Sequence, residues 1–430
     1  MSKVKKHVLS KAEGLIPDLR FPEFVNDGEW EKKKLEELGD FLGGGTPSKS
    51  NPEYWIGEIP WISSSDICED DIRSISITRF VNKNAINQSA TKVIPKGSVL
   101  FVSRVGVGKL AINECDLCTS QDFTSFVSET VHNYFIGYYS LANKHLLQSM
   151  NQGTSIKGFS KSDLENFILP YPQKHQEQQK IASCLSSLDD LITAHSDKLK
   201  ALKDHKKGLM QNLFPQEGEI VPKVRFSEFE DDGNWLPTTV EDNCLIKGRI
   251  GYRGYTKQDL VNEGEGVLVL GGKHIQNQLL NISDPTFLSW EKYYESPEIM
   301  VELNHIIFSQ RGSLGDCAII DREIGEATIN PSMVLMRDIN CNARFLYYVL
   351  IGDEIQREVS RNSTTAAIPM LSQKQIKEFP FLIPEPQEQQ KIASCLSALD
   401  ELIKAQADKI EQLQQHKKGL MQGLFPKFES

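Results

Sequence analysis

Apolar residues in the middle of the chain recur in steps of four and three residues. They are Ile181, Leu185, Leu188, Ile192, Leu199, Leu202, Leu209 and Leu213. This spacing is typical of the seam of a coiled coil, in which two amphipathic helices bury their apolar stripes against each other. Because proline does not continue a helix, Pro172 and Pro215 limit the predicted helix at its two ends.

The same helix occurs a second time near the end of the printed sequence. Residues 177–215 and 388–426 are identical at 28 of 39 positions without a gap. The apolar positions of the second copy are Ile392, Leu396, Leu399, Ile403, Ile410, Leu413, Leu420 and Leu424. Neither helix can bury its stripe alone, so the sequence predicts that two helices, each about 57 Å long at 1.5 Å per residue, pack against each other.

Both copies of the helix interrupt the apolar stripe at the same two places. The interruptions are His195 and Lys206 in the first copy and Gln406 and Lys417 in the second. Polar seam residues fix the register and orientation of paired helices at some cost in stability. We interpret His195 as a seam residue facing a polar partner rather than as an active-site histidine, because its counterpart is Gln406.

The two halves of the chain have the same order of segments. Pro17–Phe24 (PDLRFPEF) recurs as Pro222–Phe229 (PKVRFSEF), and each is followed by a variable region and then by the repeated helix. The variable regions share one further pattern, since Phe101–Ile112 resembles Phe308–Ile319 in its Phe, Arg, Gly and Ala-Ile positions. Two diverged domains of one fold explain this order most simply.

The predicted fold is therefore α+β, with two α/β domains joined by two long helices. An antiparallel pairing of these helices gives a pseudo-two-fold coiled coil with one domain at each end. The predicted boundaries are residues 1–173 for the first domain, 174–215 for the central helix, 216–385 for the second domain and 386–430 for the distal helix. The helix surfaces are nearly as similar as the seams, which favours two equivalent docking sites for a partner over helices that only close the fold.

The composition narrows the class of protein. With 39% hydrophobic and 25% charged residues, the chain of 430 residues has the balance of a globular protein of two or more domains. It contains no apolar run of membrane-spanning length, and MSKVKKHVLSKAEG lacks the apolar stretch of a signal peptide, so we expect a cytoplasmic protein. The pair Cys115 and Cys118 stands alone among eight scattered cysteines and indicates reduced thiols rather than a zinc or redox site.

The net charge of −10 argues against a protein that coats naked DNA by electrostatics alone. Any contact with nucleic acid must therefore use local patches, or partners that supply positive charge.

Two short motifs are similar to motifs of enzymes. Asn51-Pro-Glu-Tyr54 resembles the N-P-P-Y tetrad with which amino-group DNA methyltransferases hold a flipped base, but no glycine-rich cofactor loop accompanies it, and we interpret it as a loop. Val105-Gly-Val-Gly-Lys109 departs from a phosphate loop, because Ser103 stands where that motif requires Gly. We expect a tight turn between two strands there. No HExxH or GxSxG motif occurs, which lowers the expectation of an enzyme.

Several loops combine glycine with short polar, basic or aromatic residues, which suit contact with DNA. Arg and Lys pair with guanine or phosphate, Asn and Gln pair with adenine, and Gly allows close approach of the backbone. The candidates in the first variable region are Thr46, Ser48, Lys49, Ser64, Arg104, Lys109, Asn151, Thr154 and Lys157. Those in the second are Arg249, Tyr252, Arg253, Lys273, His274, Arg311, Asn362 and Thr364. Arg104 and Arg311 occupy matching positions, where either a structural carboxylate or a phosphate would suit them.

Taken together, these features resemble the specificity subunit of type I restriction–modification systems. The resemblance rests on the RF-x-EF segments, GGGTPSKSNPEYW with IPWISSSDI, the Phe-x-x-Arg turn and the duplicated EQQKIASCL…LFP helices. It implies that each variable region is a target recognition domain for one half of a split DNA sequence. The coiled coil would set the spacer and dock two methyltransferase subunits. The second half lacks a GGTP block, and Ile250–Tyr255 stands roughly in its place.

The resemblance also implies a chain without catalytic residues, metal or cofactor of its own. S-adenosylmethionine, ATP and Mg²⁺ would belong to the methyltransferase and restriction subunits, and the partners would be double-stranded DNA and those subunits, with no membrane. Two other readings remain open at the level of sequence. One is a self-contained adenine DNA methyltransferase that uses Asn51–Tyr54, and the other is a coiled-coil tether that does not bind DNA.

Overall fold

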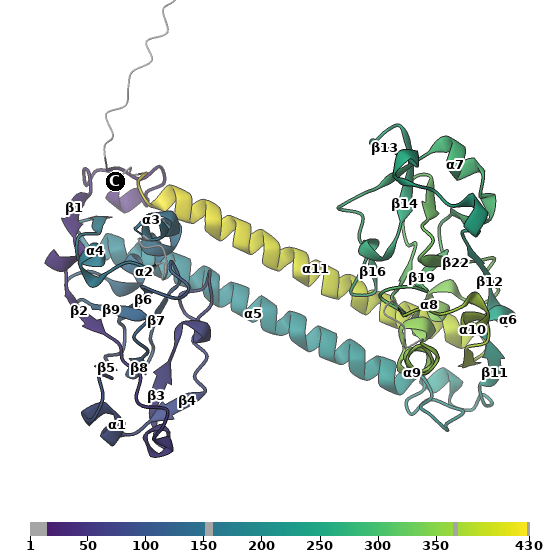
Figure 1. Ribbon diagram of the computed structural model, residues 1–430, viewed down its shortest axis with the longest axis horizontal. Coiled ribbons are helices and arrows are strands. Elements are labelled where there is room, and N and C mark those ends of the chain that lie inside the picture. Colours follow the sequence, from purple (N-terminus) through teal and green to yellow (C-terminus); the bar gives the residue numbers. More distant parts are fainter. Residues whose placement is uncertain (1–14, 151–157, 364–368, 428–430) are drawn as a thin grey trace, which may run out of the picture. The chain divides into compact units, whose positions relative to one another are not determined.

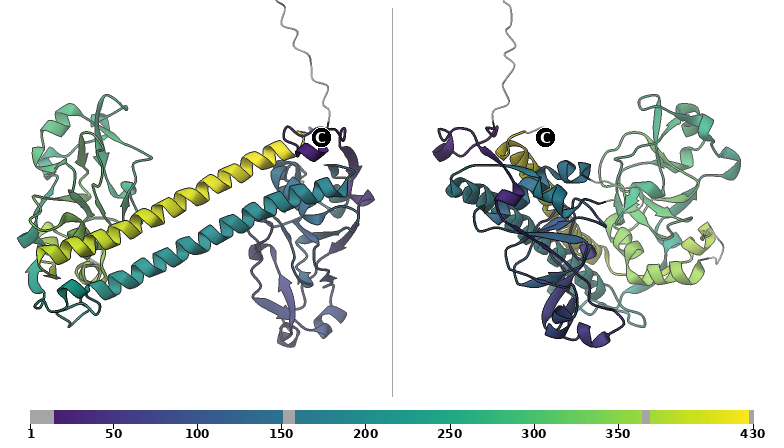
Figure 2. Two further views of the ribbon diagram at one scale, coloured as in Figure 1. Left: turned by 180° about the vertical axis from the view of Figure 1, so that it is seen from behind. Right: turned by 60° about the vertical axis from the view of Figure 1, so that its left-hand side comes forward.

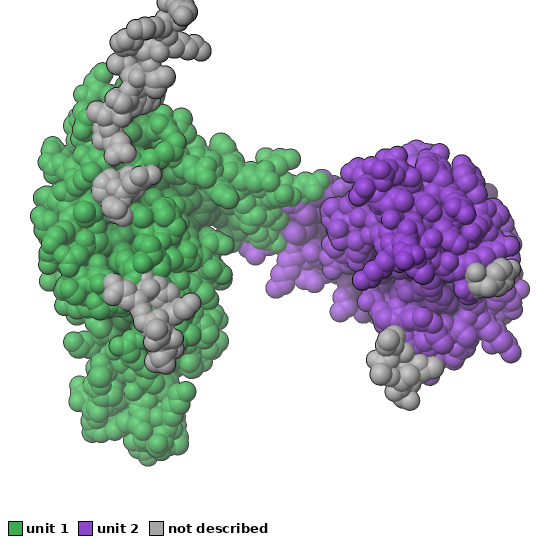
Figure 3. Space-filling view, turned by 45° about the horizontal axis from the view of Figure 1, so that its top comes forward, with its two compact units in different colours: residues 1–196, 408–430 green, residues 197–407 purple. Residues whose placement is uncertain are grey.

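The computed structural model describes residues 15–150, 158–363 and 369–427, except for the side chain of Tyr252. The chain forms two compact units, shown in different colours in Figure 3. Unit 1 consists of residues 1–196 and 408–430, and unit 2 consists of residues 197–407. Each unit contains one variable region together with part of both long helices, which confirms the expected α+β architecture of two α/β domains and two packed helices.

The two long helices are α5 (His175–Leu213) and α11 (Pro386–Leu424), with 39 residues each. In unit 1 the beginning of α5 lies beside the end of α11, and in unit 2 the end of α5 lies beside the beginning of α11 (Figures 1 and 2). The pair is therefore antiparallel within each unit. The predicted seam positions of both helices, Ile181 to Leu213 and Ile392 to Leu424, are all buried or half-buried.

The interruptions at Lys206 and Lys417 are explained by an ion pair in each unit, which is buried in unit 1 and half-buried in unit 2. In unit 1, Lys417 Nζ lies 2.5 Å from Asp189 Oδ1, and the Tyr138 hydroxyl donates to Asp189 Oδ2 at 2.6 Å. In unit 2, Lys206 Nζ lies 2.6 Å from Asp400 Oδ1, and the Tyr348 hydroxyl donates to Asp400 Oδ2 at 2.7 Å. We call these groups the Tyr–Asp–Lys triads. His195 is half-buried and Gln406 is buried, and both have partners.

The repeated RF-x-EF segments anchor the start of each domain to the start of a long helix. Arg20 donates through Nε and Nη2 to both carboxylate oxygens of Glu177, at 2.8 Å each. Arg225 makes the same two bonds to Glu388, at 2.8 and 2.7 Å. Such bidentate pairs are among the stronger charge-assisted hydrogen bonds, and the side chains of both glutamates are only 1% exposed.

Each variable domain contains the same two sheets. In unit 1 the first sheet has the order β2 (Asp40–Gly43), β9 (Phe123–Val127), β6 (Val99–Val102) and β7 (Leu110–Ile112), all antiparallel. The second sheet has the order β4 (Arg79–Val81), β3 (Ile59–Ile62), β8 (Leu117–Thr119) and β5 (Val93–Ile94). Only β3 and β8 are parallel in it.

Unit 2 repeats this topology with one additional strand at the edge of its second sheet. Its first sheet has the order β12 (Leu245–Gly248), β22 (Met333–Arg337), β19 (Ile306–Ser309) and β20 (Cys317–Ile319). Its second has the order β13 (Leu260–Val261), β17 (Phe287–Ser289), β14 (Gly266–Leu270), β21 (Ala327–Ile329) and β18 (Met300–Val301), with β14 and β21 parallel. A short ladder closes each domain, β1 (Glu31–Lys34) with β10 (Ile168–Tyr171) and β11 (Leu236–Thr239) with β23 (Pro380–Ile383).

Short helices cover the first sheet of each unit and carry the tyrosines of the triads. Tyr138 belongs to α2 (Asn133–Ala142) and Tyr348 to α8 (Ala343–Ile351). The core of unit 1 joins α2 to both long helices through Phe135, Leu185 and Leu424. The remaining short helices are α1 (Lys83–Asn87), α3 (Lys144–Ser149), α4 (Lys161–Glu165), α6 (Val240–Asn243), α7 (Trp290–Tyr294), α9 (Asp353–Asn362) and α10 (Gln373–Lys377).

The triads generate a prediction about stability. Removing one partner of a buried ion pair leaves an uncompensated charge, which destabilises a protein by about 3–5 kcal/mol. We expect Lys417→Met to lower the free energy of unfolding of unit 1 by this amount, measured by denaturant titration. Lys418→Met, an exposed neighbour, is the control. The double variant Lys417→Met with Asp189→Met should recover most of the loss, and an effect of Lys417→Met no larger than that of Lys418→Met would contradict the assignment.

Candidate functional site

The ends of several strands in unit 1 bring polar loops to one edge of the first sheet. Since β2, β9 and β6 are antiparallel neighbours, the end of β2, the start of β9 and the end of β6 meet at the same edge. Three segments leave from this edge, residues 44–49 after β2, residues 103–109 between β6 and β7, and residues 120–122 before β9. They contain most of the candidate residues of the first variable region.

The turn at residues 120–122 holds these loops together. Thr46 Oγ1 donates to Gln121 Oε1, and Ser103 N donates to Asp122 O at 2.8 Å. The segment after β3, which contains Ser64, joins the same group because Ser120 N donates to Ile62 O at 2.8 Å. We call residues 44–49, 63–66, 103–109 and 120–122 the loop face of unit 1. The sequence analysis missed Gln121 and Asp122, although a polar triplet directly before an apolar strand was the available signal.

The double glycine of the GGTP block is required by close packing. A Cβ atom at Gly44 would lie 2.0 Å from Ser120 O, whereas one at Gly43 would meet no atom within 4 Å. Gly45 N donates to Thr119 O at 2.8 Å, and Gly45 O accepts from Trp61 Nε1 at 2.9 Å. The block therefore lets the backbone of the loop lie directly on the end of β8.

Unit 2 builds the corresponding loop face with different chemistry. Residues 249–255 follow β12, as residues 44–49 follow β2. In unit 1 the backbone of Gly45 contacts the end of β8, whereas in unit 2 the side chain of Arg249 makes the corresponding contact. Arg249 Nε donates to Ile329 O at 3.2 Å, and its Nη2 donates to Thr328 Oγ1 at 3.0 Å. Ile329 ends β21, the counterpart of β8. Arg249 is 8% exposed, so the structure turns this candidate residue inward.

His274 is also buried, in the segment after β14. Its Nδ1 accepts from Gly271 N at 3.0 Å, and its Nε2 lies 3.1 Å from Asp284 O. Burial is the main cause that lowers the pKa of His274. Both ring nitrogens thus serve to hold the turn. The neighbouring Lys273 is exposed and forms an ion pair of 2.7 Å with Asp284.

The remaining described candidates have partly or fully exposed side chains. They are Thr46, Ser48, Lys49, Ser64, Arg104, Lys109, Arg253, Lys273, Arg311 and Asn362. Arg253 contacts Glu298 at 3.3 Å, and Asn362 Nδ2 donates to Glu358 O at 2.9 Å at the end of α9. Asn151, Thr154, Lys157, Thr364 and the side chain of Tyr252 lie outside the described part of the chain.

Arg104 and Arg311 occupy matching turns at the ends of β6 and β19, and both are exposed. Arg311 Nη2 lies 3.3 Å from Met370 Sδ. Within residues 15–150, 158–363 and 369–427, neither arginine forms an ion pair with a carboxylate. The sequence left two roles open for these arginines, pairing with a structural carboxylate or contact with a phosphate. The described residues give no support to the first role, and both guanidinium groups are available to an anion.

The motifs that resemble those of enzymes form ordinary local structure. Asn51 caps the 3-10 turn Pro52–Trp55 by accepting from Glu53 N at 3.2 Å, and the Tyr54 hydroxyl donates to Gln88. Cys115 is exposed while Cys118 is buried in β8, where burial raises the pKa of its thiol to about 11. Among the described residues no group of His, Cys, Asp and Glu is arranged to hold a metal ion.

Comparison with known proteins identifies relatives over nearly the whole chain. A family model described as the type I restriction modification DNA specificity domain matches residues 27–204 and 248–415. The MjaIX specificity subunit of Methanocaldococcus jannaschii is 33% identical over 192 residues, which cover 43% of this chain and 44% of that protein. The MjaVIII specificity subunit of the same organism is 23% identical over 418 residues, covering 94% and 92% of the two chains.

Two solved structures share the fold. The S subunit of a type I restriction–modification system from M. genitalium has a TM-score of 0.62 at 16% identity, covering 96% of this chain and 100% of that chain. A second structure, described as bearing on complex assembly and conformational transition of the type I system, has a TM-score of 0.55 at 15% identity and covers 92% and 97%. At these identities the likeness concerns the fold alone.

The two neighbouring glycines give a matched test of the loop face. We expect Gly44→Ala to displace residues 44–49, because its new methyl group would overlap Ser120 O. The amide of Gly45, which is bonded to Thr119 O, should then exchange with deuterium about tenfold faster. Gly43→Ala is the control and should leave the exchange unchanged. Equal exchange in both variants would show that the loop does not depend on this packing.

Proposed function

The chain belongs to the type I restriction modification DNA specificity family, and we propose that the loop face of each unit reads one half of a bipartite DNA target. Family membership makes the chain a DNA specificity subunit with two target recognition domains. Such a subunit is the non-catalytic component of its complex and binds no cofactor itself.

One observation carries the proposal that the loop faces contact DNA. The same strand ends in both units present an exposed arginine, Arg104 or Arg311, whose guanidinium has no carboxylate partner among the described residues. Arginine donates two parallel hydrogen bonds to guanine or to phosphate, so it suits either kind of contact. The other exposed candidates of each face would supply further contacts. We assign Arg249 and His274 a supporting role, since their donors and acceptors hold the loops of unit 2.

We further propose that the helix pair sets the spacer between the half-sites and docks two methyltransferase subunits. Residues that are exposed and identical in both helices support this docking, because their conservation between the two copies is not needed for packing. They include Gln179, Ser183, Asp197, Lys198 and His205 with their counterparts Gln390, Ser394, Asp408, Lys409 and His416. The two sets would offer the same surface twice.

The remaining partners follow from the same proposal. The methyltransferase subunits would bind S-adenosylmethionine, and restriction subunits would use ATP and Mg²⁺, while this chain binds double-stranded DNA. We place the assembly in the cytoplasm, where bacterial and archaeal DNA lies. No helix among the described residues is long and apolar enough to span a membrane.

The test is to map modified adenines in DNA from cells that express this chain with its methyltransferase partner. Cells that lack only this chain are the control. We expect a split motif, two short blocks around a fixed unread spacer, that depends on this chain. A short continuous motif would support the self-contained methyltransferase, and an unchanged pattern with an active partner would support the tether.

Independent reading by the two domains generates a second prediction. Replacing residues 20–170 by the corresponding domain of a relative should change one block of the motif and leave the other block and the spacer intact. The anchors Arg20 with Glu177 and Tyr138 with Asp189 must be kept so that the new domain docks. Motif mapping measures the outcome, and simultaneous change of both blocks would refute independent reading.

A further inference from the structure

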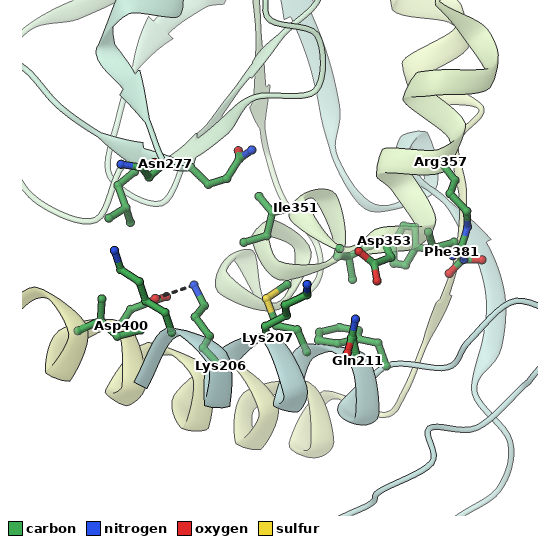
Figure 4. Close-up of a pocket in the computed structure, with 18 of the residues that line it drawn as sticks. Lys206, Lys207, Gln211, Asn277, Ile351, Asp353, Arg357, Phe381 and Asp400 are labelled. Atoms are coloured by element: carbon green, nitrogen blue, oxygen red, sulfur yellow. Dashed lines mark ion pairs between the residues drawn. The ribbon is translucent and has the colours of Figure 1, made fainter. Parts of the chain in front are cut away.

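Unit 2 contains a cavity of about 610 Å³ beside the long helices (Figure 4). Its walls come from the end of α5, the middle of α11, the junction of α8 and α9, and the hairpin of β15 (Ile275–Gln276) and β16 (Leu279–Leu280). Its apolar lining includes Met210, Phe214, Leu279, Val349 and Ile351. Figure 4 shows Lys206, Lys207 and Gln211 projecting from α5 on the side that faces Ile351.

The helix side of this cavity is rich in lysine. Lys206 is neutralised by Asp400 in the triad, but Lys203, Lys207 and Lys404 are exposed and form no ion pair with any described residue. Asp353 and Glu354 lie on the rim together with Arg357. Burial raises the pKa of Glu354 above its ordinary value. The cavity therefore combines an apolar interior with an excess of cations.

Unit 1 differs from unit 2 at the positions that create this charge. The two helices are related by the repeat, so Lys203 corresponds to Gln414 and Lys404 corresponds to Thr193. Only Lys207 has a lysine counterpart, Lys418. Two of the three unpaired lysines thus belong to unit 2 alone, whereas 28 of the 39 repeated helix positions are identical.

Unit 1 also differs in the packing that forms the interior. Phe425, the counterpart of Phe214, is 3% exposed, and its ring centroid lies 5.6 Å from that of Tyr139. In unit 2 the position of Tyr139 is taken by Val349. The smaller side chain leaves Phe214 half-buried at the edge of the cavity. Both the charge and the apolar opening are therefore features of one unit.

We propose that this cavity is a single-copy docking site for an acidic segment of a protein partner that inserts an apolar side chain. Apolar side chains provide the driving force for filling such a cavity, and carboxylates beside them would pair with Lys203, Lys207 and Lys404. A DNA backbone would satisfy the lysines but leave the apolar interior empty. The proposal goes beyond the two equivalent methyltransferase docking surfaces, because this partner would bind once per chain.

The test uses the full complex with its partner proteins and DNA. A benzophenone amino acid replaces Leu279, which is 47% exposed at the cavity, and the cross-linked peptide is identified by mass spectrometry. We expect a partner segment with Asp or Glu beside an apolar residue. The yield should fall about 2- to 30-fold in the variant Lys203→Gln with Lys404→Thr, which carries the residues of unit 1. The reciprocal variant Gln414→Lys with Thr193→Lys is the control and should not change the yield.

Other outcomes would overturn the proposal. These are cross-links to DNA, to a small molecule or to a second copy of this chain, absence of any cross-link, or a yield that Lys203→Gln with Lys404→Thr leaves unchanged. Val349→Tyr provides a second variant, because it should fill the cavity and abolish the cross-link without altering the lysines. Mapping the methylation motif in the same cells distinguishes the failure of this proposal from the failure of the proposed DNA recognition. An intact split motif without a cross-link would contradict only the docking at the cavity.

Discussion

The Tyr–Asp–Lys triads are the contacts on which the rest of each unit depends. In unit 1 the triad joins α2 of the domain through Tyr138, α5 through Asp189, and α11 through Lys417. A buried carboxylate requires both of its partners, so docking of the domain and pairing of the helices are coupled. Unit 2 uses the same three residue types with the roles of α5 and α11 exchanged. This exchange gives a structural reason for the repeated helix sequence. Each long helix must supply an aspartate to one unit and a lysine to the other.

The sequence predicted the features that depend on periodicity and repetition. The seam, the interruptions at Lys206 and Lys417 and the two related domains follow from spacing and repetition in the sequence. The antiparallel pairing was an expectation, which the structure confirms within each unit. The partners of those lysines were not visible, because Asp189 and Asp400 lie outside the seam positions and a sequence does not show which face they share. The same limit applies to Glu177 and Glu388, whose arginine partners lie more than 150 residues away in the chain.

The candidate site was predicted in part. Most of the described candidate residues lie in loops, but Asn362 ends the helix α9, and whether any of them contacts DNA stays a prediction. Their grouping arises from the strand order, which brings residues 44–49 and 120–122 together through Thr46 and Gln121. The inward direction of Arg249 depends on Ile329, 80 residues away. In unit 2, which has no GGTP block, this guanidinium contacts the end of β21, whereas in unit 1 the backbone of Gly45 contacts the end of β8. The cavity of unit 2 could not be predicted for a similar reason, because its lining residues Phe214, Leu279 and Val349 are far apart in the sequence.

Unit 1 is built from two stretches of chain that are made far apart in time. Trp30, Phe135 and Tyr139 pack around Phe425, which the ribosome adds more than 200 residues after the variable domain of this unit is complete. At a translation rate of about 5–20 residues per second, the aromatic surface stays exposed for roughly 10–50 s before Phe425 is synthesised. In unit 2 the delay is shorter, because Trp235 and Phe345, which pack on Phe214, follow it by 21 and 131 residues. During synthesis, the first domain therefore exposes an aromatic surface that can associate with other chains. The yield of the protein in the cell should depend on chaperones that bind this surface until Phe425 covers it.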